Sequence, residues 1–539
     1  MRSLKLLLIL VIVSSFSLCA KEIKLNENSN QFVVTSKSLS EFTFINYLSD
    51  ISTIRVKKDA DEFVKLLVDG YGDNAEKGDA ELPVLEELIN IPFGSTVGVE
   101  ILNIEEQIIS LSAYGINDLI FPSQPSISKA ENAEDVPFYF NQEYYNFTGF
   151  YEKDIVTIDL LGKMRSQQLA RLSVAPFKYN PSTNEVKVIT KLEVKIFFKN
   201  IDVETYIKNK QKYYSSEFNS LFKSCINYMP SNQQDIITTY PVKYVIISDP
   251  AFQSAIQPLV DWKTKKGFVV IEAYTNDPAV GSTTSSIHAY LKNMYDNATI
   301  TDPAPTYLLI VGDVGQVPSF TGNTGSHISD MYYCEFDGGG DFYPEMYYGR
   351  FSATSAAEVE IQVNKTLIHE QYTFTNVNFL DDVVLVAGVD ASMAATYGNG
   401  QINYGTDYYF NVSHGLTVHN YLYGSGTPIT SDMSQASAAI INDISEGSAF
   451  ANYTAHCGSS GWSDPSFSTA DIPSLQNNNE FGLLIGNCCQ SNKFDEPICF
   501  GEALLRANNK GAVGYIGGSN NTYWDEDYWW SVGNTSNIS

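Results

Sequence analysis

The sequence has few basic residues: 34 Lys and Arg stand against 62 Asp and Glu in 539 residues, so the formal net charge is −28. Such a charge is repelled by nucleic-acid phosphates and by anionic membrane surfaces, so neither is expected as a main partner. After residue 20, no apolar run is long enough for a transmembrane segment. Cysteine is also sparse, at seven residues, which excludes a disulfide-rich scaffold.

The remaining composition indicates a folded protein with a large core. Hydrophobic residues make up 44% of the chain and charged residues 18%, which argues against disorder and coiled coil. The length suits two large domains or about three or four average ones. With 34 Tyr, 30 Phe, 36 Gly and 20 Pro, the chain is expected to contain many strands and turns.

Residues 1–20 (MRSLKLLLILVIVSSFSLCA) have two cations, a leucine-rich run and small residues at the end. This pattern is typical of a secretory signal peptide, with cleavage expected after Ala20. Cys19 raises the alternative of a lipoprotein, but Phe16 and Leu18 fit poorly before a lipidated cysteine. The protein is therefore expected to be secreted or exposed at the cell surface of a bacterium.

Residues 21–230 form the first predicted domain, which is rich in β-structure. Apolar and polar residues alternate there, most clearly over 185–198, as in half-buried antiparallel strands of a sandwich or barrel. An exposed helix is expected over 204–228. The polar stretch 230–235 then marks the boundary with the second predicted domain, residues 231–539.

The second domain alternates strands and helices. Strands are predicted over 242–247, 268–274, 307–311, 383–389, 449–454 and 481–486, and helices over 251–266, 283–296, 355–373, 431–446 and 497–509. Apolar strands alternating with helices indicate an α/β domain with a mostly parallel sheet covered on both faces. Ligands and catalytic groups gather beyond the carboxyl ends of the strands in such sheets.

Three of these strands end in residues that could carry chemistry: Asp390, His456, and the adjacent pair Cys488 and Cys489. An imidazole beside a thiol can take its proton and later protonate a leaving amine. A carboxylate can hold that imidazole in the useful tautomer, and backbone N–H groups after His456 and at the cysteine can bind an oxyanion. The alternatives are a structural histidine, core cysteines, and an aspartate that caps a helix.

Longer motifs surround these residues. They are 451–459 (ANYTAHCGS), 484–489 (LIGNCC), 497–503 (PICFGEA), 514–517 (GYIG), 523–533 (YWDEDYWWSVG), 261–268 (DWKTKKGF), 342–346 (FYPEM) and 385–390 (LVAGVD). Together they closely resemble the gingipain family of cysteine peptidases, and its lysine-specific members above all. The resemblance covers the chain from about 240 to the end, while residues 21–230 resemble the family's inhibitory prodomain only loosely.

The resemblance implies a caspase-like catalytic domain that cleaves peptide bonds after a chosen residue, P1. It assigns Cys489 as nucleophile, His456 as base and acid, and Asp390 as orienting carboxylate. The oxyanion would meet the backbone N–H groups of Cys457 and Cys489. Because it selects Cys489 as the nucleophile, Cys488 is expected to point into the core.

The resemblance also predicts a pocket for a P1 lysine. Asp527 is the carboxylate expected to meet the ammonium group, and Thr454, Asn487 and Trp524 are expected to wall the pocket. A carboxylate in a narrow, partly dry slot favours a cation there. The alternative is that residues 525–527 form a solvated acidic loop.

Cys457 departs from the family pattern, which has glycine directly after the catalytic histidine. Its N–H can still bind an oxyanion, but its side chain crowds the site. A position that needs positive φ would also strain a cysteine. Reduced activity is one expectation, and redox sensitivity of a cluster containing Cys457 and Cys489 is another.

A glycine-rich turn at 337–345 places three carboxylates within nine residues. Hard oxygen ligands on a flexible loop suit Ca²⁺ better than zinc, and the gingipain family has a calcium site at a similar stretch. The predicted ligands of this structural ion are Asp337, Asp341, Glu345 and the carbonyl of Tyr343. The alternative is an ordinary acidic turn.

The prodomain is expected to inhibit the enzyme by placing a basic side chain in the Asp527 pocket, with Lys163 or Arg165 as candidates. No Lys or Arg occurs between Ser224 and Val242, so self-cleavage after lysine would give a mature N-terminus at Ser224 or upstream.

The leading hypothesis is thus a secreted cysteine endopeptidase, made as a zymogen, whose substrates are proteins and peptides with Lys at P1. The alternatives are a sortase-like relative that processes export signals and an inactive surface or binding homologue. Because family catalytic domains continue beyond the position of Ser539 and end in a type IX secretion signal, the sequence is expected to be a fragment.

Overall fold

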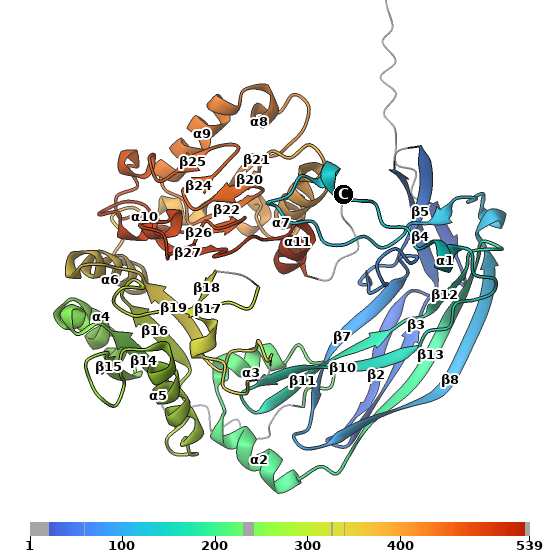
Figure 1. Cartoon of the computed structure of the whole chain (residues 1–539), viewed down its shortest axis with the longest axis horizontal. Coiled ribbons are helices and arrows are strands. Elements are labelled where there is room, and N and C mark those ends of the chain that lie inside the picture. Colours follow the sequence, from blue (N-terminus) through green and yellow to red (C-terminus); the bar gives the residue numbers. More distant parts are fainter. Residues whose placement is uncertain (1–20, 59, 230–241, 325–326, 339, 534–539) are drawn as a thin grey trace, which may run out of the picture.

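The computed structural model describes residues 21–58, 60–229, 242–324, 327–338 and 340–533. The predicted signal peptide and the predicted linker at 230–235 lie outside these residues. Figure 1 shows a β-rich part, in blue to green, beside an α/β part, in green to red. Within the described ranges, no helix has the length and apolar character needed to cross a membrane.

The β-rich part consists of three sheets around one core, antiparallel except for the pair β5 and β9, which is parallel. One sheet has the order β1-β4-β5-β9, the second β10-β11-β7-β6, and the third β12-β13-β3-β2, with β8 also paired to β13. The strand bounds are β1 Lys21–Lys24, β2 Gln31–Lys37, β3 Glu41–Tyr47, β4 Asp50–Lys58, β5 Asp61–Leu67, β6 Gly72–Asp73, β7 Pro83–Ile91, β8 Thr96–Ser110, β9 Leu119–Ile120, β10 Val156–Met164, β11 Gln167–Val174, β12 Phe177–Asn180 and β13 Glu185–Lys199.

The predicted alternation explains how these strands pack. In β13, Val186, Val188, Leu192, Val194 and Ile196 are fully buried, and charged residues lie between them. One face of the strand therefore enters the core while the other meets water. The stretch that was predicted as one or two strands is a single strand of 15 residues. The prediction of an all-β N-terminal region is confirmed.

The predicted helix over 204–228 is two helices, α2 (Val203–Lys212) and α3 (Ser216–Phe222). Asp202 caps the start of α2, and Ser215 caps the start of α3 through its side chain. A capping serine satisfies backbone N–H groups from a non-helical conformation, so it begins a new helix. The first helix accordingly ends before it.

The α/β part contains two parallel sheets where the sequence predicted one. Their orders are β15-β14-β16-β19 and β21-β20-β22-β26-β27, and all neighbouring strands in these two orders run parallel. The strand bounds are β14 Lys243–Ser248, β15 Val269–Tyr274, β16 Tyr307–Val311, β19 Tyr347–Phe351, β20 Asp382–Ala387, β21 Thr417–Tyr421, β22 Phe450–Thr454, β26 Gly482–Asn487 and β27 Ala512–Gly517. The predicted α/β fold with parallel, helix-covered strands is confirmed.

Helices flank both sheets. They are α4 Gln253–Lys265, α5 Thr284–Asp296, α6 Ala356–Gln371, α7 Asn399–Tyr408, α9 Met433–Ser445, α10 Phe500–Arg506 and α11 Trp524–Val532. The central strands are nearly all apolar: Val383 to Ala387 in β20 are 0–2% exposed. A strand covered on both faces has no alternation to show, which is why these segments appear as continuous apolar runs.

A buried ionic network joins the two sheets. Arg506, at the end of α10, donates to Asp313 at 2.9 Å and to Glu502 at 2.6 Å. Glu502 also accepts a 2.6 Å hydrogen bond from Ser352, which follows β19 of the first sheet. Because every partner is satisfied, the network can hold the sheets together without leaving an unpaired buried charge.

The α2–α3 segment contacts the α/β part, for example through Lys212 at the carbonyl of Asp296 and Phe218 against Tyr347, and two further contacts involve the predicted sites. The β10–β11 hairpin reaches the loop after residue 334, and the segment around 122–130 reaches the start of α11, as the ribbon of Figure 1 shows. The second contact carries the site described below.

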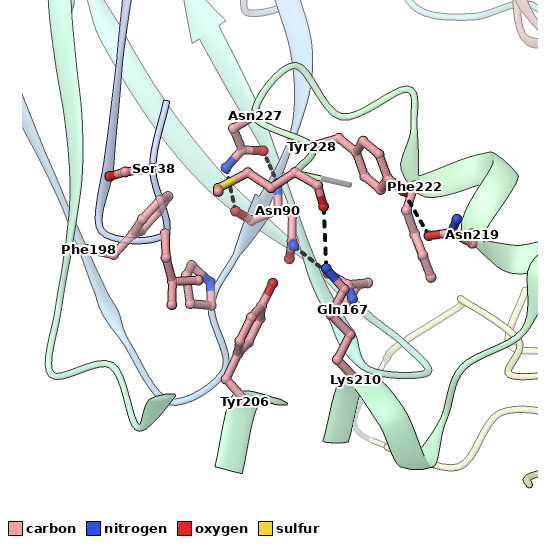
Figure 2. Close-up of a pocket in the computed structure, with 13 residues that line it drawn as sticks. Ser38, Asn90, Gln167, Phe198, Tyr206, Lys210, Asn219, Phe222, Asn227 and Tyr228 are labelled. Atoms are coloured by element: carbon pink, nitrogen blue, oxygen red, sulfur yellow. Dashed lines mark hydrogen bonds between the residues drawn. The ribbon is translucent and has the colours of Figure 1, made fainter. Parts of the chain in front are cut away.

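A separate pocket lies within the β-rich part, near its C-terminal end (Figure 2). Residues from β7, β11, α2, α3 and the segment after α3 line it. Asn227 accepts from the N–H of Asn90 at 2.9 Å and donates to its carbonyl at 2.7 Å. This two-way bond ties the segment that follows Lys223 to β7, and the pocket contains none of the predicted catalytic residues.

Candidate active site

Three neighbouring strands present the predicted catalytic residues. In the order β20-β22-β26, Ala387 pairs with Thr454, and Thr454 pairs with Asn487. His456 and Cys489 each follow two residues after the last pair. Because the strands are parallel, Asp390, His456 and Cys489 leave the same edge of the sheet.

His456 is held by an oxygen acceptor at each ring nitrogen. Its Nε2 lies 2.8 Å from Oδ2 of Asp390, and its Nδ1 lies against the backbone carbonyl of Lys129, a residue of the β-rich part. The ring also packs edge-on against Trp524. An imidazole satisfies two oxygen acceptors only by donating from both nitrogens. In this arrangement His456 has no nitrogen free to accept a proton.

Asp390 has two roles in the structure. Its Oδ1 accepts the backbone N–H groups of Ser392 at 2.8 Å and Met393 at 2.7 Å, so the carboxylate caps the turn that follows β20. Its Oδ2 is the atom that faces His456. Asp390 therefore caps the turn with Oδ1, as one alternative proposed, and faces the imidazole with Oδ2, as the other proposed. The capping bonds also hold the carboxylate in the position from which it contacts the ring of His456.

The thiol of Cys489 is almost enclosed, at 3% exposure. It accepts the backbone N–H of Thr522 at 3.4 Å. Burial raises the pKa of the Cys489 thiol, while the Thr522 hydrogen bonds and the nearby Lys129 charge act in the opposite direction. Desolvation disfavours the thiolate, so the site as it stands holds a neutral thiol.

Cys457 forms a disulfide with Cys488, with a Cα–Cα distance of 5.3 Å. The side chain of Cys457 thus turns toward Cys488, and the expected redox sensitivity of the cluster with Cys489 stays a prediction. Cys488 is fully buried in the core, as expected, but bonded rather than free. Cys225, Cys334, Cys489 and Cys499 are free among the described residues.

The predicted S1 pocket is filled by Lys129. Its Nζ donates to Oδ2 of Asp527 at 2.6 Å, to the backbone carbonyl of Asn487 at 2.6 Å and to Oγ1 of Thr454 at 3.1 Å. It also lies 4.8 Å from the ring centroid of Trp524. The Lys129 side chain is 0% exposed, and burial lowers its pKa while Asp527 opposes that change. All three ammonium protons have acceptors, as a buried cation requires.

The acidic segment is the first turn of a helix. Asp525, Glu526 and Asp527 belong to the N-terminal turn of α11, where carboxylates interact favourably with the helix dipole. Asp527 lies at the pocket, and Asp525 accepts a 2.6 Å hydrogen bond from Ser126. The alternative of a solvated acidic loop does not describe this segment.

The chain around Lys129 runs antiparallel to residues 522–525. Lys129 donates its N–H to the carbonyl of Thr522 at 2.8 Å, and Trp524 donates to the carbonyl of Ile127 at 3.1 Å. Ser128 and Tyr523 form the bridge between these bonds. The segment then turns back, because the N–H of residue 131 bonds to the carbonyl of Ser128 at 3.0 Å. It thus binds as an added strand up to Lys129 and leaves immediately afterwards.

Lys163 and Arg165, the predicted pocket residues, lie elsewhere. Lys163 forms an ion pair with Asp337 at 3.0 Å. Arg165 is buried and donates to the backbone carbonyls of Tyr213, Pro305 and Glu345. The prediction was wrong because the β10–β11 hairpin docks on the other parallel sheet. Lys129 was missed, although it is the single basic residue between Lys77 and Lys153.

The predicted calcium loop also lies under this hairpin. Asp337 pairs with Lys163, and Asp341 accepts the N–H groups of Lys163 at 2.7 Å and Tyr343 at 3.0 Å. Glu345 is fully buried, and burial, followed by the charge of Asp337, raises its pKa to about 9. Within the described ranges, no group of three or more His, Cys, Asp or Glu side chains is arranged to hold a metal.

The geometry thus defines an α/β domain with a thiol, an imidazole and a carboxylate at adjoining strand ends, and with a pocket filled by the chain's own N-terminal domain. Comparisons with known families agree with this division. The model of peptidase family C25 matches residues 237–537, and the model of the C25 propeptide matches residues 26–225.

Individual relatives are the gingipains of Porphyromonas gingivalis. Lys-gingipain W83 is 34% identical over 515 residues, covering 95% of this chain and 29% of that protein. Gingipain R2 is 26% identical, covering 82% of this chain and 60% of that protein. A solved structure described as a protease has 37% identity and a TM-score of 0.50, and it covers 56% of this chain and 64% of that one.

The chain belongs to peptidase family C25, the gingipain family of cysteine endopeptidases, and it includes that family's propeptide. This confirms the family predicted from the motifs. The chain spans less than a third of the length of the Lys-gingipain that it matches.

Proposed function

We propose that the protein is a cysteine endopeptidase that hydrolyses peptide bonds after lysine and is produced as a latent zymogen. The observation that carries this proposal is the placement of Lys129. Its ammonium group meets Asp527, Thr454 and Asn487, while its carbonyl lies at His456. A substrate lysine would place its ammonium group in the same pocket, but its carbonyl oxygen would leave Nδ1 of His456 and turn to the proposed oxyanion donors, so that its carbonyl carbon faces the thiol of Cys489.

In the proposed mechanism, the sulfur of Cys489 attacks the carbonyl carbon and His456 accepts the thiol proton. The bond from Nε2 to Asp390 leaves Nδ1 as the nitrogen that faces the substrate. The oxyanion is bound by the backbone N–H groups of Cys457 and Cys489. The imidazolium then protonates the leaving amine, and water activated by His456 hydrolyses the acyl-enzyme.

The propeptide is proposed to maintain latency in three ways. Lys129 fills the lysine pocket, its carbonyl occupies Nδ1 of His456, and the reverse turn after it keeps the following peptide bond out of an extended conformation. The thiol stays buried and neutral. When the segment leaves, Nδ1 becomes free to take the proton from Cys489.

We also propose residues 1–20 as a signal peptide, 21–230 as the inhibitory domain and 231–539 as catalytic, with the protein exported to the cell surface or beyond. The mature N-terminus is proposed at Ser224 or upstream. Lys223 is exposed, but Cys225 and Asn227 behind it are buried, so this segment must detach from β7 before or after cleavage.

A structural Ca²⁺ is proposed for the loop of Asp337, Asp341 and Glu345, with the Tyr343 carbonyl as a further ligand. The buried carboxyl of Glu345 is costly to ionise without a cation, and the ammonium group of Lys163 lies on Asp337 in the latent form. Hard oxygen donors of this kind suit Ca²⁺. The ion would stabilise the loop after the hairpin departs, without a part in the chemistry.

The test of the function is hydrolysis of peptide amides after the propeptide has been removed under mildly reducing conditions. The amides carry Lys, Arg or Glu at P1, and the Cys489→Ala variant is the matched control. Lys-amides should be cleaved, and the control should lose at least about 1000-fold in kcat/KM. Equal turnover by the control, or preference for Glu, would contradict the proposal.

A further inference from the structure

The disulfide lies directly beside the proposed catalytic pair. Cys457 follows His456, and Cys488 precedes Cys489. The bond therefore joins the residue next to the base to the residue next to the nucleophile, across 31 positions of sequence.

The backbone ladder ends before these residues. The last paired residues of β22 and β26 are Thr454 and Asn487, so His456 and Cys489 lie beyond the hydrogen bonds that fix the two strands. After the histidine, Cys457 and Gly458 enter the small antiparallel strand β23, which pairs with β24 (Gly461–Trp462), a different partner. The disulfide is thus a direct covalent link between the two loops beyond the end of the ladder.

We propose that Cys457 and Cys488 are positioning residues: their disulfide fixes the loop of His456 against the loop of Cys489 and so sets the geometry of the catalytic pair. This inference rests on the proposed function. Active enzyme then needs two oxidation states at once, a reduced thiol at Cys489 and an oxidised bond one residue away. A proton transfer between thiol and imidazole is sensitive to small displacements, so looser loops would slow the chemical step.

Reduction of the disulfide is a balanced two-electron step. A dithiol reductant loses two S–H hydrogens and closes to a cyclic disulfide, while the Cys457–Cys488 bond breaks to give two thiols. Because Cys488 is fully buried and Cys489 is not bonded to another sulfur, a monothiol at low concentration is expected to leave the bond intact.

The test starts with the unmodified protein after propeptide removal. Alkylation without reductant, followed by mass spectrometry of peptides, should show Cys489 alkylated and Cys457 bonded to Cys488. Turnover of a Lys-amide is then followed as dithiothreitol is raised, with the bond state measured in parallel. We expect kcat to fall about tenfold as the bond opens, with KM changed less than about twofold.

A second measurement uses Cys457→Ala/Cys488→Ala and the isosteric Cys457→Ser/Cys488→Ser. Both should show the lower kcat, a slower and differently pH-dependent alkylation of Cys489, and no further response to dithiothreitol. Cys225→Ala, a free cysteine near the proposed mature N-terminus that packs in a different hydrophobic cluster from Cys488, is the matched control and should behave as wild type after maturation.

Two results would overturn this inference. One is alkylation of both Cys457 and Cys488 without reductant, and the other is a kcat that does not change as the Cys457–Cys488 disulfide is reduced. Complete absence of turnover in the wild type under a mild monothiol would instead contradict the proposed function. A variant that fails to fold leaves the titration of wild type as the deciding measurement.

A second inference comes from the strand formed by the propeptide. With Lys129 as P1, the register makes Ser128, Ile127 and Ser126 occupy P2, P3 and P4. Ser126 donates to Oδ2 of Asp525 at 2.6 Å, and Glu526 follows Asp525 in the first turn of α11. Ile127 packs against the apolar core around the second sheet.

The geometry points to Asp525 and Glu526 as determinants of substrate specificity at P4, three residues before the cleaved lysine. Two carboxylates there accept a hydroxyl or a cation and repel an acidic side chain. The substrates favoured by this site are therefore lysyl peptides with a small hydroxyl or basic residue at P4 and an aliphatic residue at P3. This inference also rests on the proposed function.

The test compares amides of Ser-Ile-Ser-Lys, Lys-Ile-Ser-Lys and Asp-Ile-Ser-Lys on mature enzyme. The Asp peptide should lose about tenfold or more in kcat/KM, which corresponds to unfavourable charge at a partly buried site. Asp525→Asn/Glu526→Gln should remove that loss, whereas Asp407→Asn, on neighbouring α7, should not. Equal rates for the three peptides on the wild type would overturn this inference while the P1 preference still stood.

Discussion

The ammonium nitrogen of Lys129 lies 2.6 Å from Oδ2 of Asp527, a residue 398 positions further along the chain. The lysine side chain is fully enclosed and the carboxylate is 15% exposed. A buried ion pair is stable only when its remaining hydrogen-bonding groups are satisfied, and Thr454 and Asn487 supply the other two acceptors. The pair connects latency with specificity, because the carboxylate that binds Lys129 of the propeptide is also the one proposed to bind the P1 lysine of a substrate.

Asp527→Asn is expected to weaken both functions together. Removing one partner of a buried charge pair costs about 3–5 kcal/mol, equivalent to a loss of about 100-fold or more in binding. The mature variant should therefore lose about 100-fold in kcat/KM for Lys-amides, measured by initial rates. Trp530→Ala, an exposed residue on the same helix, is the control and should change neither rate nor latency.

Asp390→Asn is expected to lower kcat by about 100-fold and to change KM less than about twofold, because the carboxylate orients the base without touching the substrate. The amide can still cap the turn through its oxygen, so the fold should survive. Steady-state kinetics over substrate concentration separate the two constants. A rise in KM alone would contradict the orienting role.

The affinity of the propeptide for the α/β part is expected to fall as the pH rises. Burial and Glu81 raise the pKa of Asp73 to about 6, and burial and Asp525 raise that of Glu526 to about 7. Asp525 raises the pKa of Asp73 across the contact between the two parts, and the docked propeptide lies over the start of α11, which carries Glu526. Both pKa values are expected to fall when the propeptide leaves, so the stabilisation of the complex is present at low pH and is lost as the pH rises through 6–7.

This pH dependence can be measured on a chain nicked at a protease site placed within 231–240. Dissociation of the two parts, followed by size-exclusion chromatography, should increase between pH 5.0 and 7.5. Asp73→Asn/Glu526→Gln should flatten the profile. Tighter association at pH 7.5 than at 5.0 would contradict the assignment.

Calcium is expected to stabilise the mature enzyme more than the latent chain. Lys163 lies on Asp337 only while the hairpin is docked, so Ca²⁺ should raise the Tm of the mature form by several degrees, roughly the effect of 1–2 kcal/mol. Differential scanning fluorimetry with Ca²⁺ and with Mg²⁺ measures this. Glu345→Gln should remove the shift, and an equal response to Mg²⁺ would argue against the site.

Much of this architecture could be predicted from local patterns. The alternation of residues over 185–198 and the apolar runs at 383–389 and 481–486 each correspond to real strands, because burial on one face or both leaves a direct pattern in the sequence. The division of the α/β part into two sheets could not be predicted, since strand order depends on long-range pairing.

The candidate catalytic residues could also be found from the sequence, through the positions at which the apolar strands end. Asp390, His456 and the pair Cys488 and Cys489 were singled out because parallel strands of one sheet end at one edge, and the resemblance to the gingipain family then selected Cys489. Lys129 was missed because the choice of pocket residue depends on where two domains dock. The partner of Cys457 was missed because disulfide connectivity cannot be read from spacing alone.

The central claim is that Lys129 occupies the place of a substrate lysine in front of Cys489. The most direct measurement compares hydrolysis of a Lys-amide by the unprocessed chain as wild type, Lys129→Ala and Lys163→Ala, with Lys129→Ala/Cys489→Ala to exclude a contaminant. We predict at least about 100-fold higher turnover for Lys129→Ala, none above background for the double variant, and wild-type latency for Lys163→Ala. Latency that is unchanged in Lys129→Ala but lost in Lys163→Ala would contradict it.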